Sequence, residues 1–254
     1  LKKVGTDGNA LFTKLLNDAA PVSRNNTYDE NNDAGCEINA TKDYVYLAGR
    51  TSGTFWETAG KGSNDVAVAK MSTTDGAISW AKSYGGSDSD EPTDVLLDSN
   101  ENVFVLANSK SSTGDFEAIP AIGDYDIVLL KLSKTDGSLV SKYRFGTTSE
   151  DKCFTMAKDA DNNIYISGYT KGAFSGALAG TIDMFVMRVN PTTGNVDWNV
   201  QLGKAAAETT GIALAVNGSN VYVCGKTTGG FDGNAPTGSD YFVLRFDKDT
   251  GNRN

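Results

Sequence analysis

A short segment of the chain occurs twice in almost the same form. Residues 163–170 read NIYISGYT, and residues 220–227 read NVYVCGKT, 57 positions later (220 − 163). Looser copies, YVYLAGRT and NVFVLANS, lie at residues 44–51 and 102–109. Repetition at a period of this size indicates that the chain consists of copies of one supersecondary unit.

Three further markers keep the same register. Turn glycines recur at intervals of 68, 61, 57 and 57 residues, and they are Gly8, Gly76, Gly137, Gly194 and Gly251. Aspartates that open apolar runs recur at intervals of 61, 57 and 57, and they are Asp65, Asp126, Asp183 and Asp240. A phenylalanine follows each GxT-like segment, at Phe55, Phe116, Phe174 and Phe231. Three independent markers in one register exclude chance as the explanation.

Within a unit the residue pattern is that of β-strands. After the turn glycine at position 76, Ile78, Trp80 and Tyr84 alternate with smaller residues, which predicts a strand with one buried face. The apolar run before each turn is apolar on both faces, and the turn glycine suits a tight hairpin. Each unit therefore predicts four short antiparallel strands. No stripe of helical period is present, which excludes a helical solenoid.

A lone four-stranded sheet cannot cover both of its faces, and radial stacking of successive sheets solves this problem. The sequence therefore predicts an all-β protein, a β-propeller of four-stranded antiparallel blades with four repeats of about 57–61 residues. The order D…NxYxxGxT…F…D-[apolar run]-K/R…DG…W…G resembles the SBBP-type β-propeller repeat of secreted and surface proteins. This resemblance implies a propeller and no catalytic residues. The earlier units match less well, since Ala107 replaces a glycine and Ser141 replaces the tryptophan seen at Trp80.

The whole of residues 1–254 is interpreted as a single propeller or propeller segment. The blade-like units are placed at about 17–86, 87–146, 147–203 and 204–254, and residues 1–16 supply an outer strand for the last blade or a neighbouring one. Two arrangements are open: a closed four-bladed ring, or an excerpt of a longer propeller. Because the strand before the turn at Gly8 is surplus in a closed ring, we favour the excerpt.

Composition excludes several classes of function. The chain has no histidine, so Ser-His-Asp catalysis, Cys-His catalysis and histidine-ligated zinc are excluded within it. A net charge of −9 argues against nucleic acid and anionic membrane surfaces as partners. Cys36, Cys153 and Cys224 are far apart, which excludes a CxxC zinc site and allows at most one disulfide. Cys224 lies in the apolar run VYVCG and is predicted to be buried and unreactive.

The segment DADNN at residues 159–163 has the spacing that opens a calcium loop. An EF-hand needs glycine at its sixth position and glutamate at its twelfth, which here are Ile164 and Thr170, so we expect a polar hairpin turn and no metal. The aspartates that open the apolar runs are expected to accept backbone hydrogen bonds. A cation follows each of them five positions later and is expected to contact the neighbouring blade: Lys70, Lys131, Arg188 and Arg245.

Three acids lie five positions after a glycine that ends a unit: Glu91, Asp151 and Glu208 follow Gly86, Gly146 and Gly203. A pair of carboxylates can cleave a glycosidic bond without histidine. Because these acids recur with the unit, whereas a catalytic pair is usually unique, we expect none of them to be catalytic. Sequons for N-glycosylation begin at Asn25, Asn39 and Asn217.

These observations predict a non-enzymatic extracellular or cell-surface scaffold or adhesion module without cofactor or metal. The expected partners are other extracellular proteins or glycans, and copies of the chain itself in a larger assembly. Nucleic acid and membrane insertion are not expected. The alternative is a glycan-binding or glycan-acting propeller domain that uses carboxylates and aromatic residues of its loops. The tryptophans Trp80 and Trp198 occupy equivalent strand positions, which favours a role in the core.

Overall fold

The computed structural model describes residues 2–4, 10–13, 36–53, 55, 58–231 and 238–254. Four sheets follow one another along the chain and are numbered here as blades 1 to 4. Blade 1 contains β3 (Cys36–Ala40), β4 (Tyr44–Thr51), β5 (Asp65–Ser72) and β6 (Ile78–Tyr84). Blade 2 contains β7 (Asp90–Leu97), β8 (Val103–Ser109), β9 (Asp126–Leu132) and β10 (Leu139–Phe145). Blade 3 contains β11 (Asp151–Lys158), β12 (Ile164–Thr170), β13 (Asp183–Val189) and β14 (Val196–Leu202).

Blade 4 has three strands, β15 (Thr209–Asn217), β16 (Asn220–Thr227) and β17 (Asp240–Asp247). The hairpin of β1 (Lys2–Val4) and β2 (Ala10–Thr13) forms a separate two-stranded sheet. Within the described residues this hairpin is not joined to β17, so the sheets do not close into a ring. The choice between a closed ring and an excerpt therefore stays a prediction.

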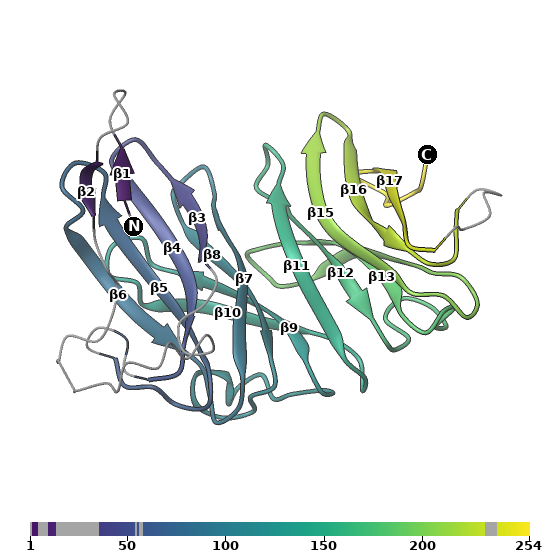
Figure 1. Ribbon diagram of the computed structural model, residues 1–254, viewed down its shortest axis with the longest axis horizontal. Helices are drawn as coiled ribbons and strands as arrows, with labels where there is room; N and C mark the ends of the chain where they lie inside the picture. The colour runs from purple at the N-terminus through teal and green to yellow at the C-terminus, as the bar shows by residue number, and fades with distance from the viewer. Residues whose placement is uncertain (1, 5–9, 14–35, 54, 56–57, 232–237) are drawn as a thin grey trace.

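The blades stand side by side, with blade 1 on the left and blade 4 on the right of Figure 1. All strand pairs within them are antiparallel and join neighbours in sequence, with β12 as the second strand of blade 3. The first strands, β3, β7, β11 and β15, each contact the next of their kind, so they are the inner strands. The only helical segment among the described residues is the 3-10 turn η1 (Gly114–Phe116). The predicted fold, an all-β propeller of four-stranded antiparallel blades, is confirmed.

Three hydrophobic cores lie between successive blades. Side chains alternate along a strand, so each blade has a forward face toward the following blade and a backward face toward the preceding one. Forward-face residues include Tyr46, Val66 and Val68 in blade 1 and Tyr165, Met184 and Val186 in blade 3. Backward-face residues include Val103, Val105 and Val128 in blade 2 and Val221, Val223 and Leu244 in blade 4.

In blades 2, 3 and 4 the turn glycine packs on an aromatic ring of the preceding blade. Gly137 has a φ of 71°, and a Cβ there would lie 2.6 Å from the Trp80 ring. Gly251 has a φ of 72° and lies in the same way on the ring of Trp198. Glycine is required twice over, by the left-handed backbone and by the close ring. Where Ser141 replaces the tryptophan, Tyr143 supplies the ring for the next turn glycine.

The opening aspartates of blades 1 to 3 and two of the cations after them behave as predicted. Asp65 Oδ2 accepts the Lys61 amide at 2.7 Å, and the aspartates of blades 2 and 3 make the same bond to the residue four positions before them. Lys70 Nζ donates to the carbonyl of Lys134 in blade 2 at 2.9 Å. Arg188 of blade 3 likewise reaches blade 4, where its Nη1 lies 3.2 Å from Asp249 Oδ1. These bonds fix the entry to each central strand and join adjacent blades.

The prediction that Cys224 is buried is wrong, because its thiol is exposed and the buried thiol is Cys153. Cys224 lies on the forward face of blade 4, at the position that Leu106 and Ser167 occupy in blades 2 and 3. Both equivalents are fully buried. An apolar local sequence therefore did not predict burial here, because burial at this position depends on a neighbouring sheet.

Candidate functional site

A cleft of about 320 Å³ lies at one end of the inner strands. Its lining comes from β4 of blade 1, from β7 and β8 of blade 2, and from β11 of blade 3: Arg50, Glu91, Pro92, Thr93, Asn108, Lys152 and Phe154. Convergence of the inner strands brings together residues that are about a hundred positions apart in sequence. The cleft thus combines one carboxylate, two cations and one aromatic ring.

Glu91 is the centre of this cleft. Its Oε1 accepts a hydrogen bond from the Tyr125 hydroxyl at 3.1 Å and lies 4.0 Å from Arg50 Nη1. Its Oε2 lies 3.8 Å from Lys152 Nζ. All three charged side chains are between one-fifth and one-third exposed. The carboxylate is therefore oriented by a neutral donor, while both cations stay beyond ordinary hydrogen-bond length and open to solvent.

Tyr125 supports both members of the Glu91–Lys152 pair. The Lys152 ammonium lies 3.7 Å from the centroid of the Tyr125 ring, which is a cation–π contact. Burial, together with the charge of Glu91, raises the pKa of the Tyr125 hydroxyl. The phenol therefore stays protonated at neutral pH and donates to the carboxylate.

The local backbone presents these side chains to solvent. Pro92 lies in β7, an inner edge strand, where the missing amide hydrogen disturbs no ladder, and the pairing with β8 is irregular between Pro92 and Asp94. Asn108 holds β11 beside β8, because its side chain accepts from the Cys153 amide at 2.8 Å and donates to the Cys153 carbonyl at 3.1 Å. The ring of Phe154 is 38% exposed beside the cleft.

Sequence reasoning grouped Glu91 with Asp151 and Glu208, and the structure separates them. Asp151 opens β11, is fully buried, and accepts the Thr147 amide at 2.5 Å. Glu208 is exposed ahead of β15. Strand pairing aligns Asp151 with the residue before Glu91, because Asp90 pairs with Ser109 as Asp151 pairs with Thr170.

The premise that Glu91 recurs with the repeat is therefore wrong. Its structural equivalent in blade 3 is Lys152. The error arose at the double glycine that follows blade 1, where Gly85, rather than Gly86, abuts the opening aspartate Asp65, as Gly146 abuts Asp126 at the end of blade 2. Arg50 was not singled out by the sequence, since only the convergence of three blades places it beside Glu91.

Asp90, which the sequence analysis passed over, is a second buried acid. Its side chain is fully buried, and its Oδ2 accepts the Gly86 amide at 2.9 Å and the Ser111 hydroxyl at 2.8 Å. Burial raises the pKa of this carboxyl to about 6, and the nearby charge of Asp65 acts in the same direction. Asp90 is closed off from the cleft and holds the start of β7 in place.

The remaining predicted sites lie elsewhere. Asp159 organises the DADNN segment as a polar turn and accepts the amides of Asp161 and Asn163, both at 2.9 Å. Among the described residues no group of three or more Asp, Glu or Cys is placed to hold a metal ion. Of the sequon asparagines, Asn217 is exposed, Asn39 is half-buried, and the one at position 25 lies outside the described residues. Glycosylation at these positions stays a prediction.

No family model and no curated protein matches the chain, so the resemblance to the SBBP-type repeat extends only to the propeller. Solved structures do resemble it. A thermostable family-43 glycoside hydrolase has 10% identity and a TM-score of 0.44, covering 83% of this chain and 67% of that one. A levansucrase variant from B. megaterium has 14% identity and a TM-score of 0.47, covering 91% and 69%. An endo-1,4-beta-xylanase from Bacteroides thetaiotaomicron has 14% identity and a TM-score of 0.41, covering 86% and 70%.

At these identities the likeness shows the fold alone. The three proteins are nevertheless glycan-acting enzymes by name, which contradicts the expectation of a non-enzymatic scaffold or adhesion module. The alternative expectation, a glycan-binding or glycan-acting propeller, agrees with them better. In the described part of the chain, no helix is both long and apolar enough to cross a membrane.

Proposed function

We propose that this chain is a glycan-binding and glycan-acting propeller domain, and that the Glu91 cleft is its sugar site. The observation that carries the proposal is the composition of the cleft. A carboxylate, two cations and an exposed aromatic ring are held by three blades around one solvent-open hollow. These groups suit a sugar, because a pyranose presents hydroxyl groups at its edges, which can bond to charged side chains, and an apolar face of C–H groups, which can pack on an aromatic ring.

The distances in the cleft leave hydrogen-bonding capacity for a ligand. Arg50 and Lys152 lie 4.0 and 3.8 Å from the oxygens of Glu91, so neither cation makes a close hydrogen bond to it. Arg50 Nε is buried and has no hydrogen-bond partner among the described atoms. A sugar hydroxyl between these groups would donate to Glu91 and accept from a cation, while the Phe154 ring stacks on the apolar face of the sugar.

Glu91 is also the kind of group that glycosidic bond cleavage requires. Cleavage needs a second carboxyl group about 5 to 10 Å from the first. The next acid along β7, Asp94, accepts the Met156 amide at 2.8 Å and so serves the contact between blades 2 and 3. The cleft therefore directly supports sugar recognition, and we propose Glu91 as one of the two carboxyl groups that turnover requires, the second lying outside the residues that line the cleft.

We place this activity outside the cell, where polysaccharides occur and where the sequons at Asn39 and Asn217 can be used. Glycans are the proposed partners, and the SBBP-type repeat is the proposed relative of the blade pattern. An acidic chain with a net charge of −9 suits neutral polysaccharides better than strongly anionic ones, although the two cations of the cleft offset this locally.

The test compares Glu91→Gln with Glu117→Gln, an exposed glutamate outside the cleft. Binding to a panel of neutral and uronic-acid oligosaccharides is measured by calorimetry, and release of reducing sugar is measured on the same panel. We expect the wild type and Glu117→Gln to bind the same member of the panel, and Glu91→Gln to lose at least about tenfold in affinity, since it loses charged hydrogen bonds. Turnover that disappears only in Glu91→Gln would establish the catalytic part. A wild type that binds nothing, or a Glu91→Gln variant that binds normally, contradicts the proposal.

A further inference from the structure

The forward face of blade 4 is apolar and exposed. It includes Tyr222, Cys224, Tyr241 and Val243, with Tyr241 89% and Val243 70% exposed. In every other blade the equivalents of these two residues are fully buried: Val66, Ile127 and Met184 for Tyr241, and Val68, Leu129 and Val186 for Val243. These two positions of the repeat are therefore packed against a neighbouring sheet in blades 1 to 3 and exposed in blade 4.

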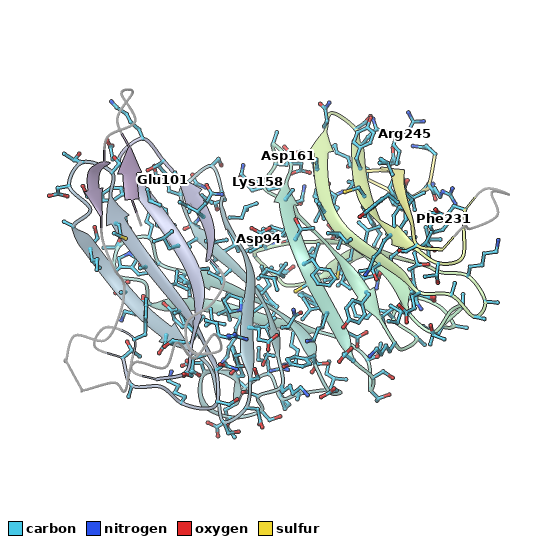
Figure 2. All side chains as sticks on the ribbon, viewed as in Figure 1. Asp94, Glu101, Lys158, Asp161, Phe231 and Arg245 are labelled. Atoms are coloured by element: carbon cyan, nitrogen blue, oxygen red, sulfur yellow. The ribbon has the colours of Figure 1, made fainter. Side chains whose placement is uncertain are left out.

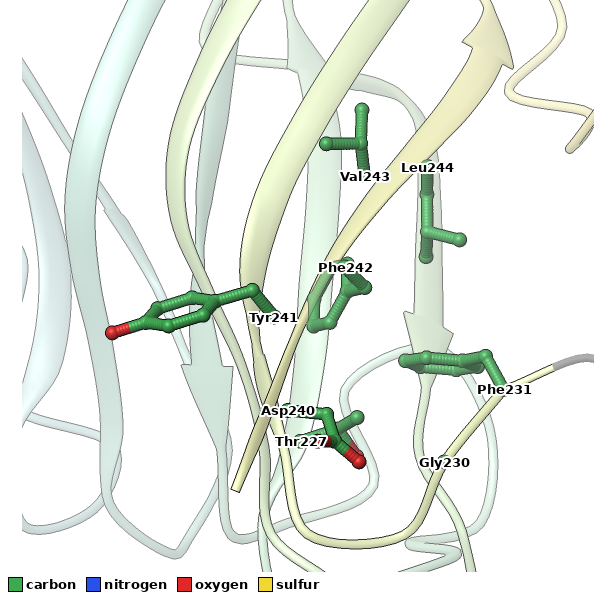
Figure 3. Close-up of a pocket in the computed structure, with 8 residues that line it drawn as sticks. All are labelled: Thr227, Gly230, Phe231, Asp240, Tyr241, Phe242, Val243 and Leu244. Carbon is green, nitrogen blue, oxygen red and sulfur yellow. The ribbon is translucent and has the colours of Figure 1, made fainter. Parts of the chain in front are cut away.

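Among the described residues, the outer edge of blade 4 is open as well. In blades 1 to 3 the third strand pairs with a fourth strand, whereas on its outer side β17 has only a single bridge within the described part of the chain, between Phe246 and Arg253. A pocket of about 450 Å³ lies along this edge. Figure 3 shows Tyr241 pointing to the opposite side of β17 from Phe231 and Leu244. A partner on the forward face would therefore cover Tyr241 and Val243 and leave the core with blade 3 untouched.

We propose that the forward face of blade 4 is the docking surface for one further blade of the same repeat. The matching surface is the backward face of such a blade, which carries aliphatic or aromatic residues where blade 4 has Val221, Val223 and Leu244. Polar contacts agree with this occupant. Lys70 and Arg188 of blades 1 and 3 donate to a turn carbonyl of the following blade. Arg245, labelled in Figure 2, is their equivalent by strand pairing and is exposed.

A second copy of this chain fits the face less well. The backward face of blade 1 is already buried, with Ala69 and Met71 exposed by no more than 1%, so it is closed to the forward face of another copy. Two forward faces packed together would bring Lys226 and Arg245 of one copy against those of the other, and like charges repel. A further blade has neither problem, and the proposal is independent of the glycan site.

The experiment duplicates one period of the chain. A copy of residues 195–251 is inserted after Gly251, so that its first strand completes the edge of β17 and its sheet follows at the natural spacing of 57 residues (251 − 194). The reporter is the exposed Cys224 thiol, in a Cys36→Ser background and with the cysteine of the copy changed to serine. We expect alkylation of Cys224 by iodoacetamide to slow at least about tenfold relative to the unextended chain, because a covered thiol reacts only when its cover opens.

A matched insertion carries Val223→Asp and Leu244→Asp in the copy alone, and it should leave Cys224 as reactive as in the unextended chain. A second insertion, a copy of residues 138–194, presents the backward face of blade 3 instead and should also protect. The proposal is wrong if neither unmodified insertion protects Cys224. This holds whether or not circular dichroism shows added β-sheet, because a docking surface should order the blade that is placed on it. It is also wrong if the unextended chain sediments as a dimer whose Cys224 is protected, which would assign the face to a second copy.

Discussion

Single residues at the blade junctions couple the stability of this propeller to pH. Asp90 is buried at the start of β7 and carries a pKa of about 6, against an ordinary value of 3.8. The folded chain therefore binds a proton that the unfolded chain has released, throughout the pH range between these two values. By linkage, this carboxyl contributes stability that is fully present below about pH 4 and is lost as the pH rises through 6.

Replacing this carboxyl should remove that dependence. Asp90→Asn keeps an oxygen for the Gly86 amide and the Ser111 hydroxyl but carries no charge at any pH. The unfolding free energy of the variant relative to wild type should therefore rise between pH 4.5 and 7.5, by on the order of 2–3 kcal/mol for a pKa difference of about two units. Urea unfolding across this range measures it, with Asp88→Asn, an exposed neighbour, as the control. A difference between Asp90→Asn and wild type that stays flat with pH would contradict the assignment.

At the scale of strands and turns, the sequence predicted what is local. The turn glycines mark hairpins because glycine adopts a positive φ without steric cost. The φ angle is positive at all four of them: Gly76, Gly137, Gly194 and Gly251. The sequence did not predict the features that depend on packing against a neighbouring sheet. Cys224 looks buried in its own strand, but its thiol is exposed, because no sheet of the described residues covers that face of blade 4. Glu91 seemed to be part of the repeat until strand pairing showed Lys152 as its equivalent.

Equivalent positions on two forward faces should differ in their energetic importance. Met184→Ser with Val186→Thr places polar groups in the core between blades 3 and 4, and together they should cost roughly 3–5 kcal/mol. The matched pair, Tyr241→Ser with Val243→Thr, acts on the exposed face and should stay within about 0.5 kcal/mol of wild type. Urea denaturation of the two double variants measures the contrast. A similar loss in both would mean that Tyr241 and Val243 are covered in solution.

For the whole molecule, the blades form a series in which each contacts mainly its neighbours. The three cores each join two successive blades, and stability in such an arrangement is a sum of blade and interface contributions. The Glu91 cleft draws on blades 1, 2 and 3 and on none of the residues of blade 4. Binding in the cleft and completion of the far end are therefore separable properties.

This separation predicts the effect of removing blade 4. A chain of residues 1–203 loses the packing of Val221, Val223 and Leu244 against blade 3, at roughly 1.5–3 kcal/mol for each side chain, and should melt at a lower temperature. It keeps Arg50, Glu91 and Lys152, so at a temperature where it is folded it should bind the same oligosaccharide as the full chain within about threefold, since its cleft contacts are unchanged. Both chains are shown to be folded by circular dichroism, and their affinities are then compared by calorimetric titration. A chain of residues 87–254, which lacks Arg50, serves as the negative control. A folded 1–203 chain without affinity for the sugar would show that the binding site extends to blade 4, and that the cleft between blades 1 and 3 had been wrongly bounded.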